Sequence, residues 1–219
     1  MTGAPHSRRE TLRRAALAAG AVASAGMLRP ALAAAQTEDE ELRDFLVEAI
    51  GLEQVTVLAY STAADQAGPD LKRVLEELRD QEQAHANALR SAIDELGFDP
   101  PEPPDSPTDT EVFDGVEGLD DDAAKTLTDR LEAIGDADGL DQLLDQLLSL
   151  EDEQITYYCT EAPRLDSYDL ATTATSIAGC QAQHVVLLET QVGHEPDDAA
   201  ASVAETAAQA GNAATAAEE

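Results

Sequence analysis

Lysine is almost absent from the 219-residue sequence, which contains only Lys72 and Lys125. Lysine and arginine together number 13 against 45 aspartates and glutamates, so the formal charge is −32. A chain with so few basic groups cannot neutralise the phosphates of a nucleic acid. It is also repelled by an anionic membrane surface. The composition therefore excludes both as partners.

Cysteine is scarce as well, with only Cys159 and Cys180. They fall on two predicted helices that are joined by a short turn. At a rise of 1.5 Å per residue, their heights along this pair of helices differ by roughly 9 Å. The Cα atoms of a disulfide lie within about 7 Å of each other. We therefore expect two separate, partly buried thiols.

The apolar stretch near the N-terminus, residues 15–28, has only 14 residues, whereas a membrane-spanning helix needs about 20. It follows the twin arginines Arg8 and Arg9 and precedes ALAAAQ, a small-residue cleavage pattern that ends near Ala35. This order resembles a twin-arginine (Tat) export signal, although Thr11 stands where that signal has a large apolar residue. We expect residues 1–35 to direct export to the extracellular space or the cell surface. The alternative is an uncleaved anchor.

Acidic residues dominate what remains after that signal. Residues 1–35 hold five arginines and one glutamate, so 8 basic and 44 acidic residues are left and the formal charge becomes −36. Such self-repulsion loosens a fold in dilute buffer, whereas in molar salt the Debye length shrinks to about 3 Å. The sequence thus resembles proteins of salt-loving organisms. The alternative is an ordinary soluble protein with an acidic face.

Four long segments have helical periodicity, and turn or helix-breaking residues separate them. We predict helices over residues 41–67, 69–96, 139–162 and 167–192. Short turns join the first two and the last two, so each pair forms an antiparallel hairpin. The connection between the hairpins is long enough to run the length of the bundle, and it contains a short predicted helix over 121–134. Residues 194–219 have scarcely any large apolar residue and are expected to be disordered or to form a frayed helix.

The two predicted hairpins resemble each other in sequence. With a shift of 98 residues, LEQVTVLAY (52–60) aligns with LEDEQITYY (150–158). With a shift of 99, EQAH (82–85) aligns with QAQH (181–184). The chain therefore has the pattern of a repeated helical hairpin, in which the repeated polar residues are the informative ones.

These polar residues interrupt the apolar seams of the four helices at about the same height. They are Glu53, Glu82, His85, Glu151, Gln181 and His184. The seams contain no lysine or arginine, and a buried carboxylate is destabilising without a partner. Glutamate and histidine three residues apart on a helix reach the same point. Their oxygen and nitrogen atoms suit iron or manganese, with zinc as a further candidate.

The pattern resembles the ferritin-like carboxylate superfamily, in which two helices each supply one glutamate and two others each supply Glu-x-x-His. More narrowly, it is similar to small exported ferritin-like domain proteins related to desiccation-associated proteins. The resemblance covers about residues 41–192, with the crossover unmatched. It implies an all-α, ferritin-like four-helix bundle of two hairpins joined by one long crossover. It also implies the metal ligands Glu53, Glu82, His85, Glu151 and His184.

Gln181 departs from that pattern. An amide carbonyl is a neutral and weaker ligand than a carboxylate, so two divalent ions would meet three carboxylates instead of four. Ferritins, by the same resemblance, also present a glutamine from the fourth helix and still oxidise iron, which favours a weakened half-site. The alternative for Glu82 with His85, and equally for Gln181 with His184, is a hydrogen-bonded buried polar pair.

Tyr60 and Tyr158 lie seven residues beyond Glu53 and Glu151. They would hydrogen-bond the ligands or take part in redox chemistry. The alternative is two structural core tyrosines with satisfied hydroxyls.

Two functions remain open from the sequence. The first is an exported monomer or homodimer that binds one or two iron or manganese ions in the bundle core and oxidises ferrous iron. The second is a metal-free structural or stress-associated helical module in which the repeat survives only as architecture.

Overall fold

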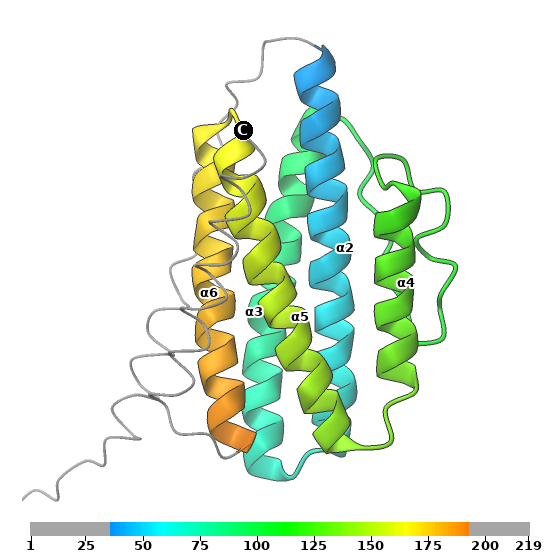
Figure 1. Ribbon diagram of the computed structural model, residues 1–219, viewed down its shortest axis with the longest axis vertical. Helices are drawn as coiled ribbons and strands as arrows, with labels where there is room; N and C mark the ends of the chain where they lie inside the picture. The colour runs from blue at the N-terminus through cyan, green and yellow to red at the C-terminus, as the bar shows by residue number, and fades with distance from the viewer. Residues whose placement is uncertain (1–35, 193–219) are drawn as a thin grey trace, which may run out of the picture.

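A computed structural model describes residues 36–192 of the chain. This part is all-helical and contains no strand. Four long helices form a bundle, and a shorter fifth helix lies on its outside (Figure 1). The elements are α2 Gln36–Gln66, α3 Pro69–Leu96, α4 Asp121–Gly135, α5 Leu140–Glu161, the 3₁₀ helix η1 Ala162–Arg164 and α6 Tyr168–Val192. The predicted all-α bundle of two hairpins joined by one crossover is confirmed.

Several sequence-based predictions fall on residues that lie outside this range. They concern the export signal over residues 1–35 and the acidic tail over 194–219. Within residues 36–192, no helix combines the length and the apolar character that crossing a membrane requires.

Both ends of α3 follow from local sequence signals. Pro69 is the first residue of α3, where a missing backbone N–H leaves no hydrogen bond unmade. Gly97 ends α3 in a left-handed conformation with φ of 84°, which favours glycine. The N–H groups of Gly97 and Phe98 then donate to carbonyls of the last helical turn, at 3.0 and 3.3 Å. The chain thus leaves α3 sharply and enters the crossover.

The crossover packs its own helix, α4, against α2 and α5 (Figure 1). The side chain of Asp120 caps α4 by accepting a hydrogen bond from the N–H of Ala123 at 2.7 Å. Gly51 of α2 permits close approach, because a Cβ there would lie only 2.6 Å from a methyl carbon of Leu127. Phe113 and Leu127 are both buried against the bundle. The crossover is therefore part of the folded core.

The core of the bundle is divided into two apolar clusters by one polar layer. In α3, Leu75 and Leu78 belong to one cluster and Leu89 and Ile93 to the other. Glu82 lies between these two pairs and is buried. The remaining long helices repeat the arrangement, so every long helix crosses the layer once. All six predicted ligand positions fall in this layer.

Candidate metal centre

The polar layer is built by one or two side chains from each long helix. Buried side chains in the layer are Glu53 of α2, Glu82 of α3, Glu151 of α5, and Gln181 and His184 of α6. His85 of α3 is the exception, since 17% of its side chain is exposed, against 1% for His184. The structure brings all six predicted residues together.

Five of these residues form two groups that share Glu82. In the first, the His184 half-site, His184 Nδ1 lies 2.7 Å from Glu82 Oε1 and 3.2 Å from Glu151 Oε1. In the second, the His85 half-site, His85 Nδ1 lies 3.5 Å from Glu53 Oε2 and 3.6 Å from Glu82 Oε2. Within each group the three ligand atoms lie within 4.8 Å of one another. Each Glu82 oxygen therefore faces a different half-site.

Burial and mutual repulsion set the charges in this layer. Burial, reinforced by the charge of Glu82, raises the pKa of Glu53 well above its ordinary value and that of Glu151 to about 7. Burial also acts to raise the pKa of Glu82, but His184 and His85 outweigh it and hold that pKa well below the ordinary value. Burial opposes protonation of His184, yet Glu151 and Glu82 raise its pKa well above the ordinary value. Without a metal ion, protons supply the positive charge that the carboxylates need.

Several buried polar atoms of the layer have no hydrogen-bond partner. Among the described residues they include Glu53 Oε2, Glu151 Oε2, His85 Nδ1 and Gln181 Oε1. Unpaired buried polar atoms are rare in folded proteins, and each calls for a ligand or a charge. The ligand atoms on offer are carboxylate oxygens and imidazole nitrogens. These atoms fit iron or manganese ions.

Two tyrosines hold the ligand carboxylates from the opposite hairpin. The hydroxyl of Tyr158 in α5 donates to Glu53 Oε1 in α2 at 2.5 Å. In the reciprocal arrangement, Tyr60 of α2 donates to Glu151 Oε1 of α5. Burial and the adjacent carboxylate raise the pKa of both tyrosines well above its ordinary value, so the hydroxyls remain donors. Hydrogen bonding to the ligands, one of the predicted roles, is thus present for both tyrosines.

Gln181 takes part through its amide nitrogen. Its Nε2 donates to Glu82 Oε2 at 2.9 Å and also to Gln154 Oε1. Gln154 Nε2 in turn donates to Thr56 Oγ1 at 3.2 Å. Sequence reasoning did not single out Gln154 or Thr56. The signal was available, because these two residues are related by the same shift of 98 as the repeated glutamates.

Gln81 and Cys180 were also missed, and both contact the outer side of His184. His184 Nε2 lies 3.1 Å from Gln81 Oε1 and 3.4 Å from Cys180 Sγ. A donor Nε2–H to the Gln81 carbonyl leaves Nδ1 free to face the carboxylates, as metal-ligating histidines are commonly arranged. Cys159 and Cys180 are both free thiols, as expected from their heights.

Comparison with known protein families shows to which family the chain belongs. The family model of the ferritin-like domain matches residues 44–194. The chain belongs to the ferritin-like family. No curated protein and no solved structure gave a significant match. The matched range includes both hairpins and all six predicted ligands, so the buried carboxylate and histidine group lies within the ferritin-like domain and is compatible with metal binding.

Proposed function

We propose that the chain is an exported ferritin-like protein that holds one or two iron or manganese ions in the polar layer and oxidises ferrous iron. The observation that carries this proposal is the placement of three buried carboxylates and two imidazoles around shared positions, with no lysine or arginine among them. Buried charges of one sign need a compensating charge close by. A divalent cation supplies that charge without bringing further side chains into the core.

The residues of the layer would supply ligands for two ion positions. Glu82 would contact both positions, Glu151 and His184 one of them, and Glu53 and His85 the other. Bound iron would supply electrons to oxygen or peroxide. The apolar clusters on either side shield the layer from bulk water except at His85, whose side chain is partly exposed. The hydroxyls of Tyr60 and Tyr158 orient the two outer carboxylates.

Metal analysis of protein purified in molar salt tests this proposal. We expect about one equivalent or more of tightly held iron or manganese, either as purified or after reconstitution. Ferrous iron added without oxygen should then oxidise faster on air exposure in the presence of the protein than in buffer. No bound metal after reconstitution would support the second candidate, a metal-free structural or stress-associated module. That candidate is favoured by the hydrogen-bonded chain from Gln181 through Gln154 to Thr56, which satisfies polar groups without an ion.

The remaining parts of the proposal concern where the protein works. We propose export by the Tat route, directed by Arg8 and Arg9 within residues 1–35. Changing both arginines to lysine should keep the protein inside the cell, whereas the same change at Arg13 and Arg14 should leave export intact. Appearance of the Arg8 and Arg9 variant outside the cell in normal amounts would contradict this route.

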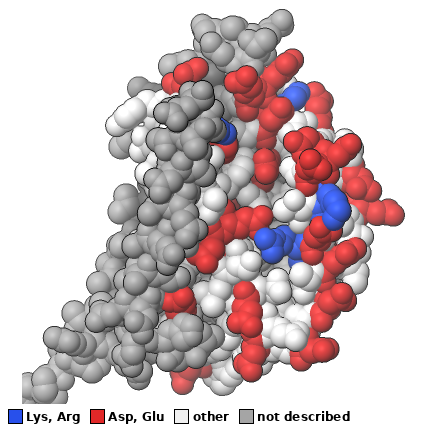
Figure 2. Space-filling model, in the orientation of Figure 1, with Lys and Arg blue, Asp and Glu red and all other residues white. Residues whose placement is uncertain are grey.

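Adaptation to high salt is proposed from charge alone. Figure 2 shows acidic side chains spread over the visible face, with few basic ones among them. We expect the protein to lose helical circular dichroism when dialysed from molar salt to a few tens of millimolar. The Debye length then exceeds the spacing of the surface carboxylates, so their mutual repulsion is no longer screened. An unchanged melting temperature across that range would contradict the adaptation.

A further inference from the structure

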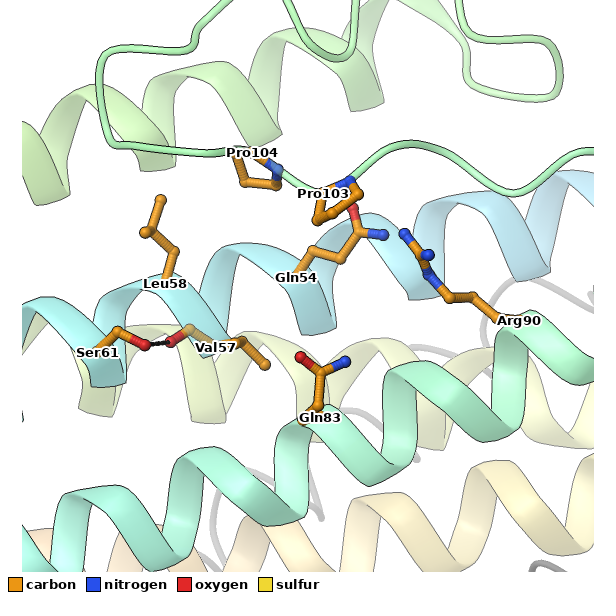
Figure 3. A pocket seen from close by; sticks show the side chains of 8 residues that line it. All are labelled: Gln54, Val57, Leu58, Ser61, Gln83, Arg90, Pro103 and Pro104. Carbon is orange, nitrogen blue, oxygen red and sulfur yellow. Dashed lines mark hydrogen bonds between the residues drawn. The ribbon is translucent and has the colours of Figure 1, made fainter.

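A pocket of about 270 Å³ lies outside the candidate metal centre, between α2, α3 and the crossover. Figure 3 shows the amide of Gln54 and the guanidinium of Arg90 reaching toward each other at one end of it. Its apolar walls are Val57 and Leu58 of α2 with Pro103 and Pro104 of the crossover. Pockets for small molecules range from roughly 300 to 1,000 Å³. This pocket therefore admits only a small ligand with an apolar part.

Arg90 differs from every other basic residue in the described part of the chain. The other seven lysines and arginines between residues 36 and 192 each have a carboxylate within 4.0 Å. Among the described residues, Arg90 has no carboxylate within 4.0 Å, and its Nη2 donates instead to the carbonyl of Pro101 at 2.7 Å. A guanidinium has five N–H donors, so most of them remain for another partner. In so acidic a protein, an arginine without a carboxylate partner among the described residues offers a place for a carboxylate from a ligand.

Gln54 supplies the second polar group and is only 5% exposed. Its Nε2 donates to the same Pro101 carbonyl at 3.0 Å, while its Oε1 has no hydrogen-bond partner among the described residues. A buried carbonyl oxygen without a donor is destabilising. A ligand that brings an N–H or O–H group would satisfy it once the Gln54 side chain turns this oxygen toward the pocket that the residue lines.

Gln54 and Arg90 attach the crossover to the bundle, but this structural role accounts for only some of their polar atoms. The shared bond to Pro101 uses Gln54 Nε2 and one nitrogen of Arg90. It leaves Gln54 Oε1 and the other guanidinium donors unused. Because both side chains contact one carbonyl oxygen, they lie close enough for a single small molecule to reach both.

We propose that this pocket binds a small aliphatic amino acid. Its carboxylate pairs with Arg90, its ammonium group donates to Gln54 Oε1, and its side chain contacts Val57 and Leu58. A zwitterion suits this protein better than a simple carboxylate, because the surrounding negative charge repels a net anion. The ligand chemistry depends on no residue of the metal centre, so it holds whether or not metal binds there.

Nuclear magnetic resonance titration of the full chain in molar salt tests the proposal with three matched probes. Valine carries both charged groups, isovalerate lacks the amine and isobutylamine lacks the carboxylate. We expect valine to cause saturable shifts of the amides of Gln54, Leu58 and Arg90, isovalerate to bind more weakly, and isobutylamine to cause no saturable shift. Absence of saturable shifts with valine, or equally tight binding of isobutylamine, would overturn the proposal.

Variants separate ligand binding from the fastening of the crossover. Arg90→Gln should weaken valine binding at least about tenfold, because a charge-assisted hydrogen bond is lost. Arg79→Gln is the control on the same helix, since Arg79 pairs with Asp80 at 2.7 Å and does not line the pocket. Val57→Phe narrows the pocket without removing either bond to Pro101, and it should abolish binding too. Wild-type affinity in both Arg90→Gln and Val57→Phe would overturn the proposal.

Discussion

The two half-sites of the candidate metal centre come from repeated sequence, yet they differ in how tightly they are assembled. In the His184 half-site the imidazole nitrogen lies 2.7 and 3.2 Å from its two carboxylates. In the His85 half-site the corresponding distances are 3.5 and 3.6 Å. His184 is enclosed, whereas part of His85 reaches solvent. One half-site is therefore closed and preassembled, and the other is wider and open.

Gln181 adds to this difference. Its amide donates to Glu82 Oε2, which is the oxygen that faces the His85 half-site. Oxygen Oε1, which faces His184, receives no such bond. An ion in the His85 half-site would share its carboxylate oxygen with an amide donor. If metal binds as proposed, a glutamine in place of the repeated glutamate would weaken the opposite half-site, through the shared Glu82.

This comparison leads to an order of binding. We expect the first ion to occupy the His184 half-site, because preassembled ligands lose less conformational freedom on binding. The second ion should bind more weakly in the His85 half-site and exchange with solvent past His85.

Removing Glu82, which both half-sites share, should disrupt metal binding at both of them. Glu82→Ala should abolish tight binding of both ions, with affinity falling more than about a hundredfold, since the loss of even an outer-shell partner costs 10- to 100-fold. Metal content after manganese reconstitution and desalting measures this loss. Glu77→Ala, an exposed position on the same helix, is the control and should bind as wild type. Retention of one tight ion by Glu82→Ala would show that the half-sites do not share this carboxylate.

Single histidine variants should separate the two half-sites. Calorimetric titration of the wild type with manganese should give a tight phase and a weak phase. His85→Ala should keep the tight phase and lose the weak one, whereas His184→Ala should lose the tight phase, by at least about tenfold in affinity. Equal effects of the two substitutions would contradict the proposed order. Total absence of binding in the wild type would contradict the metal site as a whole.

Restoring the missing carboxylate should reduce the difference in metal affinity between the two half-sites. Gln181→Glu should tighten the second ion, because it adds a fourth negative charge and removes the amide donor from Glu82 Oε2. Without metal, the same change buries an uncompensated carboxylate and should lower the free energy of unfolding by about 1–3 kcal/mol. Thermal melts with and without manganous ion measure both effects. Gln183→Glu, at an exposed position of α6, is the control.

Destabilisation of Gln181→Glu in both conditions, with no recovery in metal, would support the metal-free alternative. A ligand that binds only the folded state raises its stability, so recovery with metal is the signature of a real site.

Much of this architecture could be predicted from the sequence, because helical periodicity and turn residues act locally. The seam of α3 placed Glu82 and His85 in line with Leu78 and Leu89, and the structure has both in the polar layer. The repeat indicated which polar residues to compare between hairpins. The same repeat related Thr56 to Gln154, although neither residue carries a charge that would have drawn attention to it.

The difference in exposure between His85 and His184 could not be predicted, because the apolar seams of α3 and α6 have the same spacing. Their exposure depends on how helices from different hairpins pack, and α3 contacts α6 less extensively than α2 contacts α5. The pocket lined by Gln54 and Arg90 could not be predicted either. Its polar end depends on Pro101, which reaches Gln54 across 47 residues of chain. The part of the crossover around Pro101 has no helical periodicity, so the sequence does not indicate which bundle residue it contacts.

The smallest expected effect comes from the two tyrosines that hold the outer carboxylates. Tyr158→Phe removes the hydrogen bond to Glu53 and should weaken only the second, weakly bound ion, whereas Tyr60→Phe removes the bond to Glu151 and should weaken the first. Each substitution keeps the aromatic ring, so we expect affinity to fall about tenfold and stability by about 1 kcal/mol. Tyr157→Phe is the matched control, because that hydroxyl donates to the carbonyl of Phe45 outside the layer. Calorimetric titration should show each tyrosine acting on its own phase, while equal loss from both phases in either variant would mean that the two half-sites behave as one.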